Sequence, residues 1–351
     1  MIFLLDTEQR DFTASLDAQL SAADVPAVIR ARAAGDPAPL RALWERLGQS
    51  GVFALTAPEK YQGMGLLPVE LAVACVELGR HAVPGPLAET FAAAALLGSL
   101  GGEAADRWLP RAAAGTALLT LAAAELSPYS ADGDLADVRL LLTAEELRLA
   151  ETERSKATLD PARRLTRLTD GKLIASGPQL TDAAAHAVDV ATLATAALAL
   201  GTGRRLLADT VGYANTRVQF GTPIGAFQAV KHRLADVLLQ LEFAEPLLHA
   251  AAVALQEVAR QEVVLQDAAP ASSTTARAAS ADTAAAKAAC GDAAYAAARA
   301  ALQLHGAIGY TDEFNVSLWI RRARVLRSAW GSPSACRLRV LEHRDGLGRR
   351  A

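Results

Sequence analysis

Apolar residues recur at helical spacing through the first third of the chain. Over residues 40–53 they fall on one face of a helix, and the pattern ends at Gly51. After a Gly- and Pro-rich turn, residues 68–100 carry two more helical patterns, broken at residues 83–86. The sequence therefore predicts an N-terminal helical domain over residues 1–115.

The pattern changes in the middle of the chain. Residues 117–126, 135–152 and 161–177 hold short apolar runs separated by polar turns. This spacing predicts strands in a small antiparallel sheet. Residues 142–149 fit a short helix equally well. We expect a reduced middle β domain over residues 116–178.

Long helices return from about residue 180 to the C-terminus. Pro246 predicts a kink in one of them, because proline lacks the backbone N–H. Residues 270–280 are small and polar and are expected to form a loop before an Ala-rich bundle helix. One apolar stripe comprises Phe227, Val230, Leu234, Leu238, Leu241 and Leu248. The pattern predicts a C-terminal four-helix bundle over residues 179–351, in a fold that is mainly α with a small β domain.

Composition narrows the possible functions. With 52% apolar and 5% aromatic residues, the chain favours closely packed helices. A net charge of −3 gives no electrostatic reason to expect nucleic acid or an anionic membrane as a partner. Cys75, Cys290 and Cys336 lie far apart, so neither a disulfide framework nor a metal site is expected. Because Asp, Arg or His interrupts each apolar run before the roughly 20 residues that span a bilayer, we expect a cytoplasmic protein.

The first motif with chemical content lies in Gly212–Asp236, which reads R-x-Q-F-G-x-P-I-G-x-F-Q before a long helix. Arg217 offers a forked, permanently charged donor suited to a pyrophosphate. The helix after the glycine turn presents free N–H groups to an anion. Phe227 and Gln228 at its start are placed to flank an adenine or a ribose. Taken alone, Arg217 would be an ordinary surface arginine; the complete pattern is what favours a nucleotide.

The second motif lies in Ala301–Ala323, where a glycine turn follows a helix. Gly306 and Gly309 allow the backbone to approach a ligand closely and to adopt a positive φ. Gln303 supplies an amide for hydrogen bonds. His305 has no His, Cys or Asp partner at metal-ligand spacing, so a packing histidine is the simpler interpretation.

Both motifs resemble those of the acyl-CoA dehydrogenase family, as do PEKYQGMG at residues 58–65 and ELGRHAVPGP at residues 77–86. The predicted domain order is also that of the family. The resemblance implies a bound FAD, whose ADP part the second motif reaches across a subunit boundary. It carries the cofactor contacts over to Arg217, Gln219, Phe220, Phe227, Gln228, Gln303, Leu304, His305, Gly306 and Ala307. Ala307 stands where the family usually has a second glycine, a small change that still allows close approach.

The resemblance fails at the residue on which the family's chemistry depends. In the family, a Glu carboxylate removes the α-proton of an acyl-CoA while the β-hydrogen leaves as a hydride to the flavin. Trp330 stands where most members have that Glu, and Ala191 occupies the position that a minority uses. The motifs that cover the flavin ring are also eroded, with residues 124–134 as the nearest counterpart. No catalytic residue is therefore expected in this chain.

Three interpretations follow. The first is a non-catalytic subunit of a heteromeric, α2β2 acyl-CoA dehydrogenase that shares its FAD with a homologous catalytic partner, as in actinobacterial heterotetramers. Its substrate would be an acyl-CoA, such as a bulky steroid side-chain thioester in a β-oxidation pathway, and its electron acceptor an electron-transferring flavoprotein. The second is a self-sufficient dehydrogenase whose base is Glu125, Asp312, Glu313 or Glu342. The third is a non-enzymatic scaffold, against which the complete motif around Arg217 argues.

Overall fold

The N-terminal third is helical, as the apolar pattern predicts. The computed structural model describes residues 5–264 and 273–348. Its first helices are α1 (Thr7–Ser21), α2 (Val25–Ala33), α3 (Ala38–Gln49), α4 (Pro68–Arg80), α5 (Leu87–Leu100) and α6 (Gly102–Ala113), with the short 3-10 turns η1 (Val52–Thr56) and η2 (Glu59–Tyr61) between α3 and α4. Trp44 and Leu47 of α3 are fully buried, and Gly51 turns the chain after this helix with a φ of 77°. The predicted apolar face of α3 is thus the face that enters the core.

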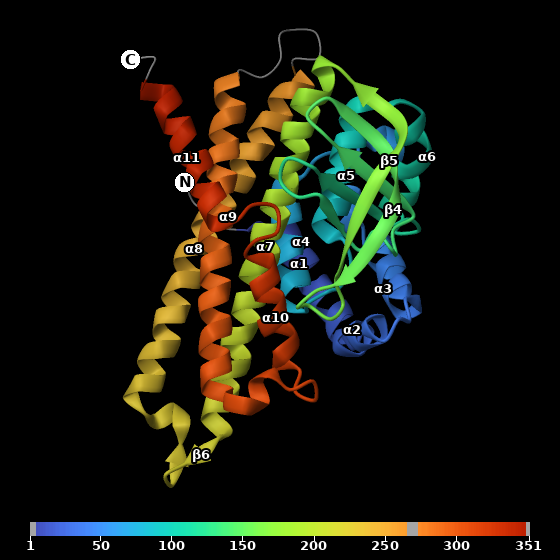
Figure 1. Cartoon of the computed structure of the whole chain (residues 1–351). Helices are drawn as coiled ribbons and strands as arrows, with labels where there is room; N and C mark the ends of the chain where they lie inside the picture. Colours follow the sequence, from blue (N-terminus) through green and yellow to red (C-terminus); the bar gives the residue numbers. More distant parts are fainter. Residues whose placement is uncertain (1–4, 265–272, 349–351) are drawn as a thin grey trace.

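A five-stranded sheet packs on α5, α6 and the start of α7 (Figure 1). Its strands are β1 (Leu119–Ala123), β2 (Tyr129–Ala131), β3 (Val138–Leu142), β4 (Glu146–Ala157) and β5 (Arg164–Ser176), in the spatial order β1-β3-β4-β5-β2. Neighbouring strands are antiparallel except β1 and β3, which are parallel with Leu119 opposite Val138. The antiparallel prediction is wrong for this pair, because the chain passes through β2, which pairs with β5, before it returns to β3 beside β1. The helix considered for residues 142–149 is also wrong, since these residues form a turn and the start of β4.

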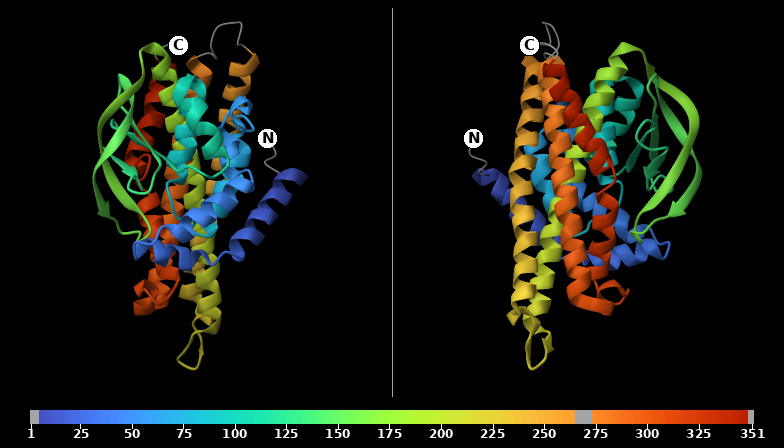
Figure 2. Two further views of the ribbon diagram at one scale, coloured as in Figure 1. Left: turned by 90° about the vertical axis from the view of Figure 1, so that its right-hand side faces the viewer. Right: turned by 60° about the vertical axis from the view of Figure 1, so that its left-hand side comes forward.

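The C-terminal half is a helical bundle. Its members are α7 (Pro178–Thr216), α8 (Gln228–Val264), α9 (Ser273–His305), α10 (Val316–Leu326) and α11 (Pro333–Gly348). Helices α7, α8 and α9 pack together, and α10 and α11 follow one another along α9 (Figure 2). Helix α8 continues through Pro246. The predicted loop over residues 270–280 is wrong for residues 273–280, which belong to α9. Its remaining residues, 270–272, lie outside the described part of the chain.

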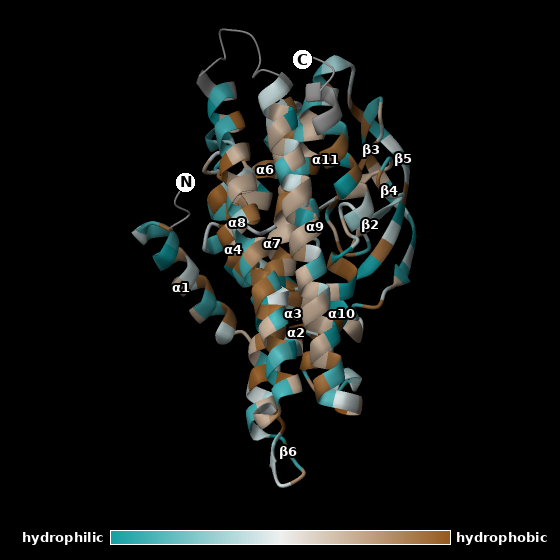
Figure 3. Cartoon of the chain, turned by 90° about the vertical axis from the view of Figure 1, so that its left-hand side faces the viewer, coloured by the Kyte–Doolittle hydropathy of each residue, from teal (hydrophilic) through white to brown (hydrophobic). Residues whose placement is uncertain are grey.

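One side of α8 is apolar and exposed. Leu241 and Leu248 of the predicted stripe are buried, but Leu238 is 47% exposed, so the stripe does not form one buried face. Helix α8 packs on α4, α7 and α9, which leaves its opposite side uncovered. We call Leu239, Phe243 and Leu247 on this side the α8 apolar face; their side chains are 54%, 74% and 44% exposed. Figure 3 views the molecule from the left-hand side of Figure 1, where α8 lies.

Helices α7 and α8 are both long and apolar enough, by length and composition alone, to cross a membrane. In α7 the apolar window is 78% buried inside the protein, which identifies it as a core helix. In α8 the corresponding window is 33% buried. Burial within this chain therefore explains the apolar composition of α7 but not that of the exposed side of α8. Exposed apolar surface of this kind is typical of a contact with a protein partner.

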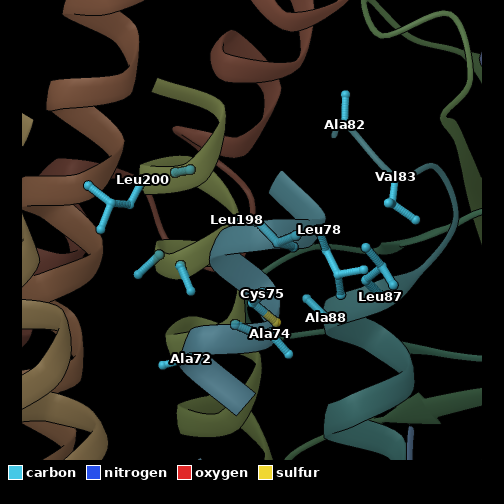
Figure 4. Packing of buried hydrophobic residues seen from close by; sticks show 14 of the residues in the cluster. Ala72, Ala74, Cys75, Leu78, Ala82, Val83, Leu87, Ala88, Leu198 and Leu200 are labelled. Atoms are coloured by element: carbon cyan, nitrogen blue, oxygen red, sulfur yellow. The ribbon is translucent and has the colours of Figure 1, made fainter. Parts of the chain in front are cut away.

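Helices α4 and α7 cross closely at two glycines. A Cβ at Gly201 would lie 1.8 Å from the carbonyl oxygen of Val76, and one at Gly79 would lie 2.2 Å from that of Leu198. Around this crossing the side chains of α4, α5 and α7 form one buried cluster (Figure 4). The backbone contact brings α7, which carries Ala191, against the N-terminal domain.

We expect Gly201→Ala to lower the free energy of unfolding by about 3 kcal/mol, because the added methyl meets backbone rather than a movable side chain. The measurement is the urea midpoint. Gly212→Ala, in the same helix but with open space around it, is the matched control and should be neutral or stabilising by up to about 1 kcal/mol. Equal, small effects of the two substitutions would contradict the close crossing.

A buried ion-pair network holds α2 against the sheet. The guanidinium of Arg32 lies 3.2 Å from a carboxylate oxygen of Asp132 and 2.9 Å from one of Asp134. Burial raises the pKa of Asp132 to about 6. The backbone N–H of Arg164 donates to the same carboxylate at 2.9 Å. The network therefore joins α2 to the start of β5.

Candidate functional site

The first predicted motif forms a hairpin at one end of the bundle. Helix α7 ends at Thr216, and the chain reverses through β6 (Val218–Gln219), β7 (Thr222–Pro223) and the short turn η3 (Ile224–Ala226) before α8 begins. The N–H of Ile224 donates to the carbonyl of Arg217 at 2.8 Å, which closes the hairpin. Figure 1 shows the hairpin projecting beyond the other helices, away from the five-stranded sheet.

The side chains of this hairpin face solvent. Phe220 is 94% exposed at a φ of +55°, a conformation that bulky residues rarely adopt. Its ring packs edge-on against that of Phe227, with centroids 6.2 Å apart. Arg217, Gln219 and Gln228 are exposed. Among the described residues, no carboxylate lies within ion-pair distance of Arg217.

The second predicted motif lies beside the first. Helix α9 ends at His305 and is followed by the turn η4 (Gly306–Tyr310). The imidazole of His305 stacks on the ring of Tyr213 in α7 at 4.2 Å, which brings the two motifs to the same end of the bundle. Gln303, Gly306 and Ala307 are exposed, and Leu304 is half-buried.

His305 is a packing residue within this chain. It is 5% exposed, and its Nδ1 lies 2.8 Å from the carbonyl oxygen of Ala301. The other ring nitrogen, Nε2, is buried and has no hydrogen-bond partner. A buried polar atom without a partner is costly, so Nε2 marks a place where a molecule outside this chain can contribute a hydrogen bond.

Trp330 lies far from that end, in the loop between α10 and α11. Its indole N–H donates to Glu89 Oε1 at 3.1 Å, and its carbonyl accepts from the Thr192 hydroxyl at 3.4 Å. Its φ is +52°, so the backbone is held in a sparsely populated conformation. The loop is thus fixed from α5 and from α7.

A buried lysine fixes the same loop from a third helix. Lys287 of α9 is fully buried, and its ammonium donates to the carbonyls of Arg327 at 3.2 Å and Gly331 at 3.1 Å. Burial lowers the pKa of Lys287 to about 8. The sequence analysis missed this residue, because a lysine in an Ala-rich helix gives no local sign that it points inward.

The second position expected to hold a base, Ala191, is fully buried in α7. It belongs to the apolar cluster against which Trp330 packs. The two positions predicted to correspond to the family's base therefore lie against the same apolar cluster. Apolar side chains fill both of them.

The carboxylate that Trp330 contacts is Glu89, which the sequence analysis missed. It is 5% exposed, and the guanidinium of Arg163 lies 3.5 Å from its Oε1. The available signal was a single acidic residue in the apolar run of α5. Such a residue is buried only when tertiary partners are present, here Trp330 and Arg163.

A cavity of about 650 Å³ opens between the sheet and the α10–α11 loop, and we call it the outer cavity. Its walls include Leu121 of β1, Tyr129 of β2 and the indole of Trp330. Beyond Trp330 and Glu89 lies an inner cavity of only about 30 Å³, which both residues also line. No predicted cofactor-binding residue lines either cavity.

The four candidates for a relocated base differ in whether they line the outer cavity. Glu125 lines the outer cavity and is exposed. Asp312 is held by Arg321 at 2.9 Å on the surface. Glu313 and Glu342 are exposed, and neither lines a cavity described here. Among the described carboxylates, Glu125 and the unpredicted Glu89 line the outer cavity, where a base would have to lie.

A separate cluster of Asp17, Glu77 and His81 brings its ligand atoms within 4.8 Å of one another. The guanidinium of Arg80 already lies 3.6 Å from Asp17 and 3.2 Å from Glu77. The hydrogen bond from His81, at 2.8 Å, lowers the pKa of Asp17. The cluster is best described as an ion-pair network that joins α1 to α4.

Comparison with known proteins places the chain in a family. The family model described as "Acyl-CoA dehydrogenase, N-terminal domain" matches residues 6–116, and that described as "Acyl-CoA dehydrogenase, C-terminal domain" matches residues 181–343. The chain belongs to the acyl-CoA dehydrogenase family, whose members are flavin-dependent oxidoreductases.

Individual relatives agree with this assignment. "Acyl-CoA dehydrogenase IpdE2" of Mycobacterium tuberculosis is 35% identical over 312 residues, which is 85% of each chain. Among solved structures, the ChsE4-ChsE5 complex from Mycobacterium tuberculosis has a TM-score of 0.79 at 24% identity, covering 97% of this chain and 98% of that one. The Tcur3481-Tcur3483 steroid ACAD, a G363A variant, has a TM-score of 0.76 at 23% identity, covering 98% and 99%. These two structures share the fold.

The family implies FAD as the cofactor, and the hairpin end of the bundle fits part of it. The exposed cation of Arg217, which pairs with no carboxylate among the described residues, suits a pyrophosphate, and the exposed ring of Phe220 offers an apolar surface. The buried Nε2 of His305 lacks a hydrogen-bond partner. The outer cavity fits the family's reaction less well, because the indole of Trp330 lines it at the position predicted for the base.

Proposed function

We propose that this chain is the non-catalytic subunit of a heteromeric FAD-dependent acyl-CoA dehydrogenase. One observation carries the proposal. The predicted cofactor-binding residues project from the hairpin end of the bundle, away from the outer cavity of the same chain, while Trp330 fills the place of the base. A chain built in this way can contribute to a neighbour's active site but does not complete its own.

The partner is a homologous acyl-CoA dehydrogenase subunit that carries the catalytic Glu. Two of the solved structures with this fold are named as pairs of different subunits, ChsE4-ChsE5 and Tcur3481-Tcur3483. The α8 apolar face supports such a partner, because exposed contiguous apolar surface is typical of interfaces. We infer a heterotetramer in which each cofactor is shared between unlike subunits.

In the reaction, the partner's carboxylate takes the α-proton of the acyl-CoA. When bound, FAD would supply the acceptor for the β-hydrogen, which leaves as a hydride. This chain's part is to bind and orient: Arg217 would hold the pyrophosphate, and Gln303 and the turn at Gly306 would lie close to the ADP part. An electron-transferring flavoprotein is the expected acceptor. The steroid named for Tcur3481-Tcur3483 supports a bulky CoA thioester as substrate.

The test is to produce the chain alone and together with candidate acyl-CoA dehydrogenase partners from the same genome, and to measure flavin absorbance and acyl-CoA dehydrogenation. The lone chain should be nearly colourless and inactive, and the pair yellow and active. A pair that carries Trp330→Ala in this chain should keep most of its turnover. A lone chain that is yellow and active would overturn the proposal.

The second candidate function is a self-sufficient dehydrogenase, and Glu89 is the observation that favours it. Its carboxylate lines the outer cavity, where the indole of Trp330 donates to it at 3.1 Å and the guanidinium of Arg163 lies 3.5 Å away. Glu89→Gln separates the two functions. It should abolish turnover if Glu89 is the base, and should leave the turnover of the pair largely unchanged if the partner supplies the base.

A further inference from the structure

We propose that the outer cavity is a second ligand site, which binds a compact, flat, apolar molecule that carries one carboxylate. This inference goes beyond the proposed function, because it concerns the cavity that the shared active site leaves unused. It rests on three observations: the size and closure of the cavity, its apolar walls and its accessible cations.

The cavity has the size and shape of a small-molecule site. Its volume of about 650 Å³ lies within the roughly 300–1,000 Å³ that is usual for such sites. Trp330 closes its inner end, since only about 30 Å³ remains beyond the indole. A long acyl chain therefore cannot pass inward, whereas a compact ring system can rest against the indole.

The walls suit a flat apolar body. Leu121 and Ala123 of β1 and Leu165 of β5 line the sheet side, and Val325 and Ala329 line the side of α10. The indole adds an aromatic surface on which a ring can stack. Its position is fixed from three helices, so the stacking surface is already formed before a ligand arrives.

Two arginines supply charge. Arg163 lies 3.5 Å from Glu89 and offsets its charge, and the Arg163 side chain is 17% exposed. Arg324 is exposed at the rim, where its described contacts are the Ser328 hydroxyl at 3.3 Å and the Tyr295 ring at 5.9 Å. Guanidinium groups with free donors match a carboxylate in a planar, forked geometry.

The two acidic residues that line the outer cavity do not cancel its preference for a carboxylate ligand. Glu89 is engaged by Trp330 and Arg163, and Glu125 is exposed to solvent, which screens its charge. Ser332 precedes α11, whose first turn also lines the cavity through Ala335. The positive end of this helix adds to the same field.

The proposal is tested by calorimetric titration of the full-length chain with 2-naphthoate and with its neutral analogue 2-naphthamide. We expect one molecule of naphthoate per chain, bound about tenfold or more tightly than the amide. Arg324→Gln should remove most of this difference by weakening the acid alone. Arg46→Gln, an exposed arginine on α3, is the matched control and should change nothing.

Ala335→Trp gives a second test that does not disturb the core, because Ala335 is exposed in the first turn of α11. Its indole should block the mouth and abolish binding of both compounds while the thermal midpoint stays unchanged. Equal affinity for acid and amide, no binding of the acid, or binding that survives Ala335→Trp would overturn the proposal. If the lone chain carries flavin that naphthoate displaces, the cavity is a flavin site, and the proposed function fails as well.

Discussion

Replacing Arg217 with Ala should strip FAD from the proposed heteromeric complex and leave both subunits folded and associated. Arg217 is exposed and makes no ion pair with a described carboxylate, so its loss removes no such contact within the chain. A hydrogen bond to a charged phosphate contributes about 1.5–3 kcal/mol, which is roughly a tenfold to hundredfold loss in affinity. Flavin content after gel filtration and the Kd from flavin fluorescence measure the effect, and turnover should fall with occupancy.

Two controls make this result specific. Arg217→Lys keeps the charge but loses the fork, so it should retain an intermediate affinity. Arg46→Ala removes an exposed arginine from α3 and should leave flavin content unchanged. A complex with Arg217→Ala that keeps its full flavin content would show that this arginine does not contact the cofactor.

Phe243→Asp should dissociate the proposed heteromer without unfolding this chain. Phe243 is 74% exposed in the isolated chain, so the change costs little stability there. In an interface, the substitution would lose the burial of an aromatic ring, about 1.5–3 kcal/mol. It would also leave an uncompensated buried charge, which costs about 3–5 kcal/mol when its partner is absent. Analytical ultracentrifugation of the purified pair measures the effect.

Ala42→Asp is the matched control for this prediction. Ala42 is an exposed helical residue of α3, which lies on the opposite side of the molecule from α8 (Figure 1). It introduces the same charge on a helix and should leave the pair intact. If Phe243→Asp leaves the pair intact as well, the α8 apolar face does not form the interface.

Most of the fold could be predicted from local pattern. The apolar face of α3 and the glycine turn at η4 are encoded by residues close together in the sequence. The parallel pairing of β1 with β3 could not be predicted, because it depends on the pairing of the intervening strand β2 with β5, which is distant in sequence. Likewise, the uncovered side of α8 depends on which helices surround it.

The residues of the candidate site also fall into those that short motifs predict and those that depend on distant contacts. Arg217 and Gln303 were found through short motifs, and the structure brings these motifs to one end of the bundle. Glu89, Arg163 and Lys287 were missed because each acts through a partner distant in sequence: Glu89 contacts Trp330, and Lys287 holds the carbonyl of Gly331. Whether the predicted cofactor contacts form stays a prediction.

The way the Trp330 loop is held also bears on evolutionary reversibility. Trp330→Glu alone would return a carboxylate to the family's position, but it would remove the indole that donates to Glu89. Two carboxylates would then share one buried wall, where like charges raise each other's pKa. Thr192 and Lys287 would still fix the loop backbone. A chain with the proposed role would therefore need several coordinated substitutions to regain a base of its own. A single reverting substitution would not remove its dependence on the partner.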